Sequence, residues 1–220
     1  MKQIKLTVYR VSELDESVKA RVIDHYRDIN VDDESWYECE IENTGDDLAE
    51  IGITIDPQKV FFDLHDRTIT MDEVQIDLDN SNLQKELWKD ADWNRFLSAM
   101  SIEALVHTSK KVSDYIYGIT IDWGKGGLTG LTLHFEYDEE AIIDLFGSDR
   151  KGLTAEETSN LIGNLEARLV RILDDAAQNL LKQLDTTYYD LITDESVMET
   201  LEENEFMFTK AGTHIRSHKI

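Results

Sequence analysis

Apolar residues recur every three or four positions in two stretches near the N-terminus, after a short alternating run at 3–10 that predicts a strand. This spacing is typical of helices with one buried face. The first helix is predicted to begin after Ser12, a candidate N-cap, and its stripe is Leu14, Val18, Val22, His25 and Ile29. The second contains Gly45, where it could break, and its stripe is Tyr37, Ile41, Thr44, Leu48 and Ile51.

From Gly52 the spacing of apolar residues changes to two, which predicts strands near 53–55, 60–64 and 74–78, with a turn at 65–68. Residues 83–106 return to a helical period. Two alternating runs, 115–123 and 131–137, then flank the glycine-rich stretch 124–130 and predict a hairpin. On the first of these runs the side chains expected to be buried are Tyr115, Tyr117, Ile119, Ile121 and Trp123.

The last third of the chain is predicted to be a long helix, followed by a short acidic helix at 194–205 and a final strand at 206–209. Its main seam is Ile162, Leu165, Leu169, Ile172 and Ala176, with a second stripe at Leu173, Ala177, Leu181 and Leu184. The seam 162–176 could pair across a twofold axis in a homodimer, and a core helix in a monomer explains it equally well.

The order of these elements predicts an α+β fold, with a largely antiparallel sheet, flanking helices and a long C-terminal helix. The length of 220 residues is compatible with a single domain. Two packed lobes are the alternative, an N-terminal α/β lobe at 1–80 and a lobe of hairpin and long helix at 81–220.

The charge of the chain narrows the classes of function. The sequence has 46 Asp and Glu against 22 Lys and Arg, a net charge of −24. Such a surface repels nucleic acid and anionic membranes, and it attracts basic partners. The sequence has one cysteine, no apolar core of a signal peptide and no run of about 18 apolar residues. These features predict a cytoplasmic location. The 4 Trp, 8 Tyr and 7 Phe exclude a disordered acidic tail.

Motifs for catalysis or metal binding are weak. The glycines of 124–130 lack the order of a phosphate-binding loop, in which Lys and then Ser or Thr follow the last Gly. Asp63, His65 and Asp66 are the densest group of metal-ligand types, without a recognised spacing. Cys39 lies between two glutamates, which disfavour a thiolate. We therefore expect no enzyme, no catalytic residue, no cofactor and no metal.

Acidic residues are concentrated in three clusters. Between Glu13 and Glu50 there are 14 acids and 3 bases. The candidate partner-binding residues there are Asp32, Asp33, Glu34, Glu38, Glu40, Glu42, Asp46 and Asp47. A second candidate surface comprises Asp194, Glu195, Glu199, Glu202 and Glu203, and a smaller cluster spans 136–140. The alternative interpretation is a solvated surface that keeps the protein soluble.

Three segments resemble small acidic bacteriophage and prophage proteins of mostly unknown function, some of them labelled antitoxin-like. They are Val8–Arg27, Ile51–Asp56 together with the following Val60–Phe62, and Tyr188–Thr209. The resemblance implies a phage or prophage origin and a role in the cytoplasm of an infected bacterium. It assigns no functional residue.

Origin and charge together favour an acidic binder that inhibits a basic, nucleic-acid-handling host protein, such as a defence nuclease. The mechanism would be nucleic-acid mimicry or occlusion, with carboxylates in place of phosphates. The alternatives are an antitoxin-like partner of a basic toxin and a phage enzyme with an unrecognised carboxylate site. Replacing Asp32, Asp33, Glu34 and Glu38 with Lys is expected to abolish binding and to leave the fold intact.

Overall fold

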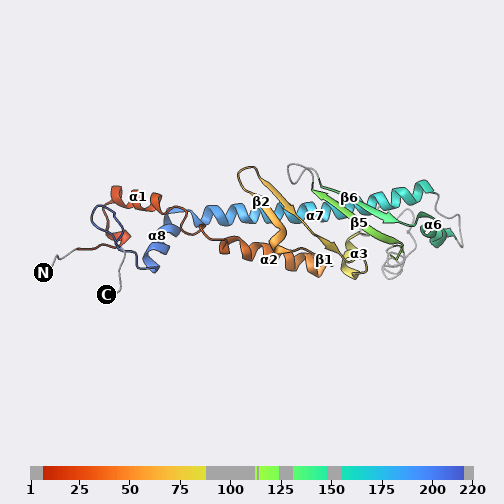
Figure 1. Cartoon of the computed structure of the whole chain (residues 1–220), viewed down its shortest axis with the longest axis horizontal. Coiled ribbons are helices and arrows are strands. Elements are labelled where there is room, and N and C mark those ends of the chain that lie inside the picture. The colour runs from red at the N-terminus through yellow and green to blue at the C-terminus, as the bar shows by residue number, and fades with distance from the viewer. Residues whose placement is uncertain (1–6, 88–111, 113, 124–130, 148–154, 216–220) are drawn as a thin grey trace. The chain divides into compact units, whose positions relative to one another are not determined.

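The protein is described by a computed structural model that covers residues 7–87, 112, 114–123, 131–147 and 155–215 (Figure 1). Its helices and small antiparallel strand pairs confirm the α+β class and the long C-terminal helix. The chain folds into two compact units: unit 1 is 1–39 with 183–220, and unit 2 is 40–182. This grouping differs from the lobes expected at 1–80 and 81–220, which stay a prediction.

Unit 1 contains the short 3-10 helix η1 (Val11–Glu13), α1 (Glu16–His25) and α8 (Asp194–Glu203). It also holds the first residues of α2 (Ser35–Glu50) and the last of α7 (Ala155–Leu191). The prediction of Ser12 as the N-cap was wrong. Ser12 lies inside η1, which the Glu13 carboxylate closes by accepting from the Arg10 backbone N–H at 2.8 Å. The N-cap residue of α1 is Asp15.

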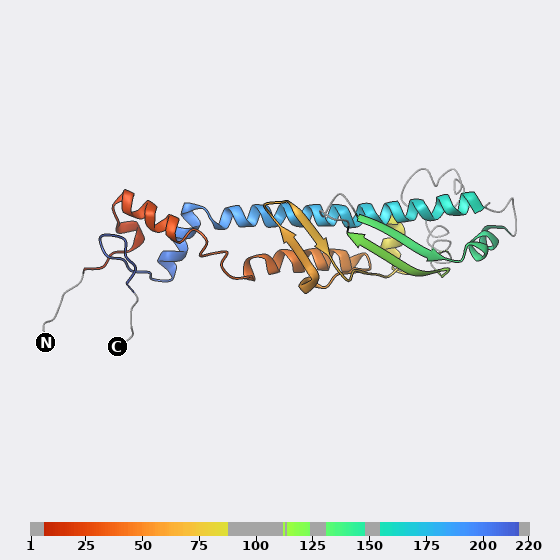
Figure 2. The ribbon, with the colours of Figure 1, turned by 45° about the horizontal axis from the view of Figure 1, so that its top comes forward.

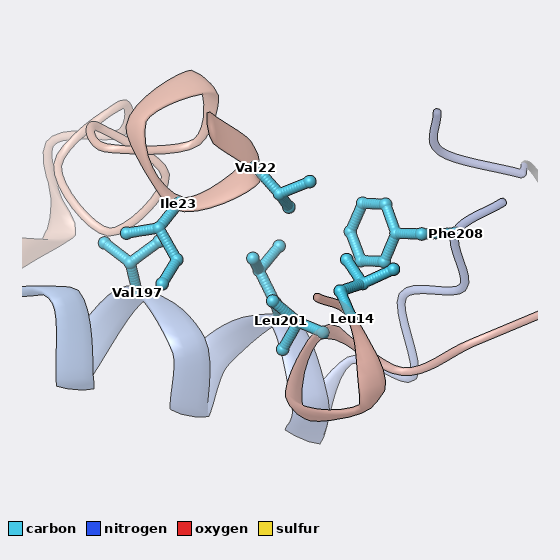
Figure 3. Close-up of a cluster of buried hydrophobic side chains, with 7 residues drawn as sticks. Leu14, Val22, Ile23, Val197, Leu201 and Phe208 are labelled. Atoms are coloured by element: carbon cyan, nitrogen blue, oxygen red, sulfur yellow. The ribbon is translucent and has the colours of Figure 1, made fainter. Parts of the chain in front are cut away.

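The core of unit 1 joins segments from both ends of the chain. Side chains from η1, α1, α8 and the segment after α8 converge in Figure 3, and the buried members are Val11, Leu14, Val22, Ile23, Val197, Leu201 and Phe208. Ile29 packs on this core from beyond the end of α1, whereas the predicted stripe member His25 is exposed. Gly212, at φ +87°, passes so close to α1 that a Cβ there would lie 2.9 Å from the Val18 side chain.

The final strand expected at 206–209 is reduced to single-residue bridges. Phe208 pairs with Tyr9 on one side and with His214 on the other, in both cases antiparallel. The Tyr9 and Phe208 backbones exchange two hydrogen bonds of 2.9 Å. The described part of the predicted strand at 3–10 therefore contributes one bridging residue.

Unit 2 begins with the remainder of α2, which is continuous through Gly45. Its strands are β1 (Ile53–Thr54), β2 (Val60–Asp63), β3 (Thr68–Met71), β4 (Gln75–Ile76), β5 (Ile116–Trp123) and β6 (Leu131–Tyr137). Its other helices in the described residues are η2 (Pro57–Lys59), α3 (Ser81–Leu87), α6 (Glu139–Gly147) and α7 up to residue 182. The predicted helix at 83–106 coincides with α3 up to residue 87, and the rest lies outside the described residues.

The strands of unit 2 form three antiparallel pairs among the described residues: β1 with β4, β2 with β3, and β5 with β6 (Figure 2). The sequence pattern missed β3, because its alternating Thr and apolar residues directly follow the turn 64–67. The strand expected at 74–78 is only the two residues of β4. The glycine-rich link at 124–130 lies outside the described residues.

The β5–β6 pair confirms the predicted alternation on β6 and breaks it on β5. Leu131, Leu133 and Phe135 are buried, whereas the residues between them are exposed. On β5 the register shifts between Ile116 and Gly118, which is a β-bulge. A bulge adds one residue and reverses the facing of its neighbours. Tyr117 is therefore 73% exposed, contrary to the prediction that it is buried.

Helix α7 buries most of the predicted seam within the chain itself, whereas Ile172 and Ala176 are partly exposed. Ile162, Leu165 and Leu169 are no more than 3% exposed, and Leu173, Ala177, Leu181 and Leu184 of the second stripe are also buried. Polar side chains fix the helix to its neighbours, since Glu166 accepts from the Phe135 N–H at 2.7 Å and Arg168 donates to the Glu86 carbonyl. This burial is what a core helix requires. A homodimer through 162–176 stays a prediction. Among these residues there is no exposed apolar stripe that would support it.

Candidate protein-binding surface

The first acidic candidates of unit 1 surround the start of α2. Asp32, Asp33, Glu34 and Glu38 are all exposed. Asp33 also has a structural role, because one oxygen accepts from the Ser35 N–H at 2.8 Å and from the Ser35 hydroxyl. These hydrogen bonds hold the pKa of the Asp33 carboxyl below its usual range. Asp33 therefore orders the entry into α2 as well as contributing charge.

Glu34 is tied to an aromatic side chain. The Tyr37 hydroxyl donates a hydrogen bond to the Glu34 carboxylate. Burial raises the pKa of Tyr37, and repulsion between its phenolate form and Glu34 and Glu38 adds to the effect. The hydrogen bond thus holds the Glu34 carboxylate at the Tyr37 hydroxyl.

Four aromatic rings lie together in unit 1, and we call them the aromatic quartet: Trp36, Tyr37, Tyr188 and Tyr189. Trp36 contacts Tyr37 edge-on, with ring centroids 5.3 Å apart, and lies 5.8 Å from Tyr188. Tyr188 in turn contacts Tyr189 edge-on at 5.5 Å. Tyr189 is 61% exposed, and the other three are partly exposed. Sequence analysis did not find this group, because its two halves come from opposite ends of the chain.

The quartet lies in a strongly acidic sequence context. Residues 30–39 and 183–192, which carry the four rings, contain no Lys or Arg. Besides the four acids at 32–38, they include Asp185 and Asp190, which flank the tyrosine pair. One exposed and three partly exposed rings that neighbour carboxylates in the chain suit the recognition of Arg and Lys, because a ring face attracts a cation and a carboxylate pairs with it.

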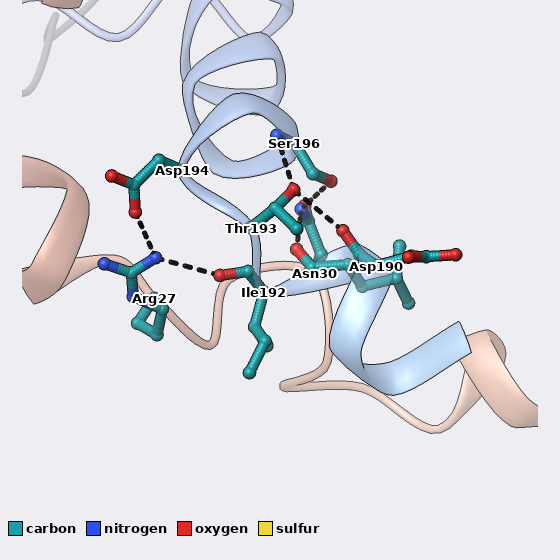
Figure 4. A network of polar contacts seen from close by, with 8 residues as sticks. Arg27, Asn30, Asp190, Ile192, Thr193, Asp194 and Ser196 are labelled. Carbon is teal, nitrogen blue, oxygen red and sulfur yellow. Dashed lines mark hydrogen bonds and ion pairs between the residues drawn. The ribbon is translucent and has the colours of Figure 1, made fainter. Parts of the chain in front are cut away.

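The second acidic candidates belong to α8, and part of their charge is used inside unit 1. Figure 4 shows the contact: the Arg27 guanidinium forms an ion pair with Asp194 and donates to the Ile192 carbonyl at 2.9 Å. Asn30 adds hydrogen bonds to the Leu191 carbonyl at 2.9 Å and to the Ser196 hydroxyl at 3.0 Å. These contacts hold the start of α8 against the segment that leads to α2.

The other α8 candidates differ in exposure. Glu195, Glu199 and Glu203 are exposed, whereas Glu202 is partly buried with one carboxylate oxygen out of contact with solvent. Asp194 is already paired with Arg27. Four of the five predicted residues of this cluster are therefore exposed, and one of these four is paired with Arg27.

The remaining candidates of the first cluster belong to unit 2, on α2. Glu42, Asp46 and Asp47 are exposed there, and Glu40 is partly buried. The acidic residues at 136–140 include Asp138, whose carboxylate accepts from the Ala141 N–H at 3.0 Å at the start of α6. The predicted acids thus lie in both units. The aromatic quartet lies in unit 1, together with the acids of that unit.

No metal site emerges among the described residues, since nowhere in them do three His, Cys, Asp or Glu side chains gather in a suitable arrangement. Asp63, from the group considered above, accepts from the backbone N–H of His65 at 2.8 Å and of Asp66 at 2.9 Å. It therefore closes the turn between β2 and β3. Cys39 is exposed on α2.

Comparison with known proteins found no relative of this chain. No family model, curated protein or solved structure matches the chain. In the part of the chain that the structure describes, no helix has the length and apolar character needed to cross a membrane.

Proposed function

We propose that this chain is a non-catalytic binding protein of phage or prophage origin, which acts in the bacterial cytoplasm. It inhibits a basic, nucleic-acid-handling host protein, such as a defence nuclease, by occupying the path of the nucleic acid. The observation that carries the proposal is the aromatic quartet of unit 1, with exposed Tyr189 and the carboxylates of 32–38 beside it in the chain.

The two kinds of side chain correspond to the two kinds of contact that a nucleic acid makes. Proteins that hold single strands combine Lys and Arg for the phosphates with side chains that stack on the bases. Carboxylates can pair with those same cations, and aromatic rings offer a planar face to an Arg guanidinium. Tyr and Trp are also the residues most enriched at the energetic centres of protein interfaces. The quartet can therefore form the energetic centre of an interface, which a surface of carboxylates without aromatic rings would not provide.

A charge-reversal pair tests the proposal. We expect Asp32→Lys with Glu38→Lys to weaken binding of the host partner about 100-fold, because close charge pairs across interfaces contribute about 1.5–7 kcal/mol and reversal turns attraction into repulsion. Asp33 and Glu34 are left unchanged, since they bond Ser35 and Tyr37. The partner is captured from a bacterial lysate at low salt, purified and titrated with each variant at two salt concentrations.

The matched control is Asp24→Lys with Asp66→Lys, which changes the net charge equally at two exposed sites, one in each unit. This variant should bind within about threefold of the original chain, as expected of isolated surface charges. Equal weakening by both variants would mean that the charge acts only as a general property of the protein, and the proposed surface would be wrong.

A further inference from the structure

The end of α7 combines the exposed ring of the quartet with a carboxylate that was not among the predicted binding residues. Tyr189 is 61% exposed, and Asp185, one turn earlier on the same helix, is partly exposed. Residues at this spacing lie on the same face of a helix. Helical side chains also lean toward the N-terminus, so the Tyr189 ring lies on the side of the turn that carries Asp185. This face of α7 therefore presents an aromatic ring and a carboxylate next to each other.

Neighbouring side chains hold the Tyr189 ring in place. Tyr188, which is partly buried, contacts Tyr189 edge-on, with 79° between the ring planes, and lies 5.8 Å from Trp36. The helix end is fixed as well, because Asn30 donates to the Leu191 carbonyl at 2.9 Å. A ring that is already positioned loses little conformational freedom when a ligand binds to it.

The charge of Asp185 is available to a ligand. None of the ion pairs formed within the described residues involves Asp185, although Lys182 lies close before it on α7. Residues 183–192 contain no Lys or Arg. A cation that contacts the Tyr189 ring can therefore also pair with the Asp185 carboxylate.

The ring and the carboxylate together suit the guanidinium of arginine better than the ammonium of lysine. A guanidinium is planar, so it can lie flat on an aromatic ring while it donates two parallel N–H bonds to a carboxylate. An ammonium is a compact and strongly hydrated charge, which loses hydration when it contacts a ring. This pair of groups can therefore distinguish two cations that a purely electrostatic surface would bind equally.

We infer that Tyr189 and Asp185 bind an arginine side chain of the partner protein and prefer it to lysine. The guanidinium stacks on the exposed ring and pairs with the carboxylate. The inference rests on the proposed function, because it names the chemical group that the surface of unit 1 recognises in its partner. It makes recognition depend on the type of cation as well as on net charge.

Two fluorescent peptides of equal length and charge test the preference, one with about four Arg-Gly-Ser repeats and the other with the same number of Lys-Gly-Ser repeats. Their binding to the full chain is measured by fluorescence anisotropy at low salt. The arginine peptide is expected to bind about fivefold more tightly, the usual size of an exposed contact between a cation and an aromatic ring. Equal affinity for the two peptides would overturn the inference.

Variants of Tyr189 separate the contribution of the ring from that of its hydroxyl. Tyr189→Ala removes the ring face, so the two peptides should then bind within about twofold of each other. Tyr189→Phe keeps the ring face, so the preference for arginine should remain. Thermal unfolding shows that both variants are folded. A preference that survives Tyr189→Ala, or is lost in Tyr189→Phe, would contradict stacking on this ring.

The carboxylate is tested with Asp185→Asn, which removes the charge and keeps the size of the side chain. This variant should bind the arginine peptide about fivefold more weakly. The matched control is Asp24→Asn, the same change at an exposed residue of α1 in the same unit, and it should weaken the peptide less than about twofold. Equal weakening by both variants would show attraction to the overall charge and would overturn the role of Asp185.

The peptide measurements separate this inference from the proposed function. If the host partner requires the Tyr189 ring and the two peptides bind equally, the inference fails and the proposed function stands. If the chain prefers the arginine peptide and retains no nucleic-acid-handling protein from a bacterial lysate, the inference stands and the proposed function fails.

Discussion

Phe208→Ala is expected to destabilise unit 1 by about 3–5 kcal/mol, the usual effect of removing a fully buried aromatic ring. Phe208 is 0% exposed, and it lies in the core between α1 and α8 (Figure 3). Its backbone also bridges Tyr9 on one side and His214 on the other, so its side chain anchors segments from both chain ends. Urea unfolding measures the loss of stability. Hydrogen exchange should locate the loss of protection in 11–29 and 194–208.

The control for this substitution is Phe61→Ala, the same chemical change at a residue that is 54% exposed on β2. Little apolar surface is uncovered there, so a loss below about 1 kcal/mol is expected. If Phe208→Ala costs no more than Phe61→Ala, the segment after α8 does not form part of the unit 1 core.

Tyr189→Ala is expected to weaken binding of the host partner about 30-fold and to change the stability of the chain little. An exposed ring contributes little to folding, whereas an aromatic residue at an interface centre often contributes about 2 kcal/mol to binding. Tyr189 is 61% exposed, and its ring contacts Tyr188. Titration of the purified partner gives the affinity, and thermal unfolding of the variant shows that the fold is retained.

Tyr117→Ala is the matched control, because Tyr117 is the other highly exposed tyrosine among the described residues and belongs to unit 2. It should leave affinity for the quartet's partner unchanged. If Tyr189→Ala binds the partner normally, the quartet is not part of the interface, whatever the effect of the charge-reversal pair.

The fold was predictable where one period persists over a long segment. The stripes of α2 and α7 and the alternation of β6 follow from residue spacing alone. The errors arose from single-residue features, such as Ser12 inside η1 and the bulge that exposes Tyr117. A bulge or a 3-10 turn changes the facing of its neighbours without a distinct signal in apolar spacing.

The sequence predicted the acidic charge of the candidate site. It did not predict which acids are available for binding or that aromatic rings lie among them. Counting acids gives equal weight to Glu38, which is exposed, and to Asp194, which is paired with Arg27. It also could not bring Trp36 to Tyr188, because that contact depends on long-range packing within unit 1. The backbone hydrogen bond of Asp33 could be anticipated, since Asp often accepts from the N–H two residues later at a helix start.

Whether the chain occupies the nucleic-acid path of its partner, as proposed, is decided by a competition experiment. A fluorescent single-stranded oligonucleotide is bound to the purified partner, and the chain is added at fixed salt concentration. We expect the chain to displace the oligonucleotide, the apparent Kd of the oligonucleotide to rise linearly with the concentration of added chain, and Tyr189→Ala to displace it about 30-fold less effectively. A ternary complex in which chain and oligonucleotide bind the partner together would show that the chain does not occupy the path of the nucleic acid.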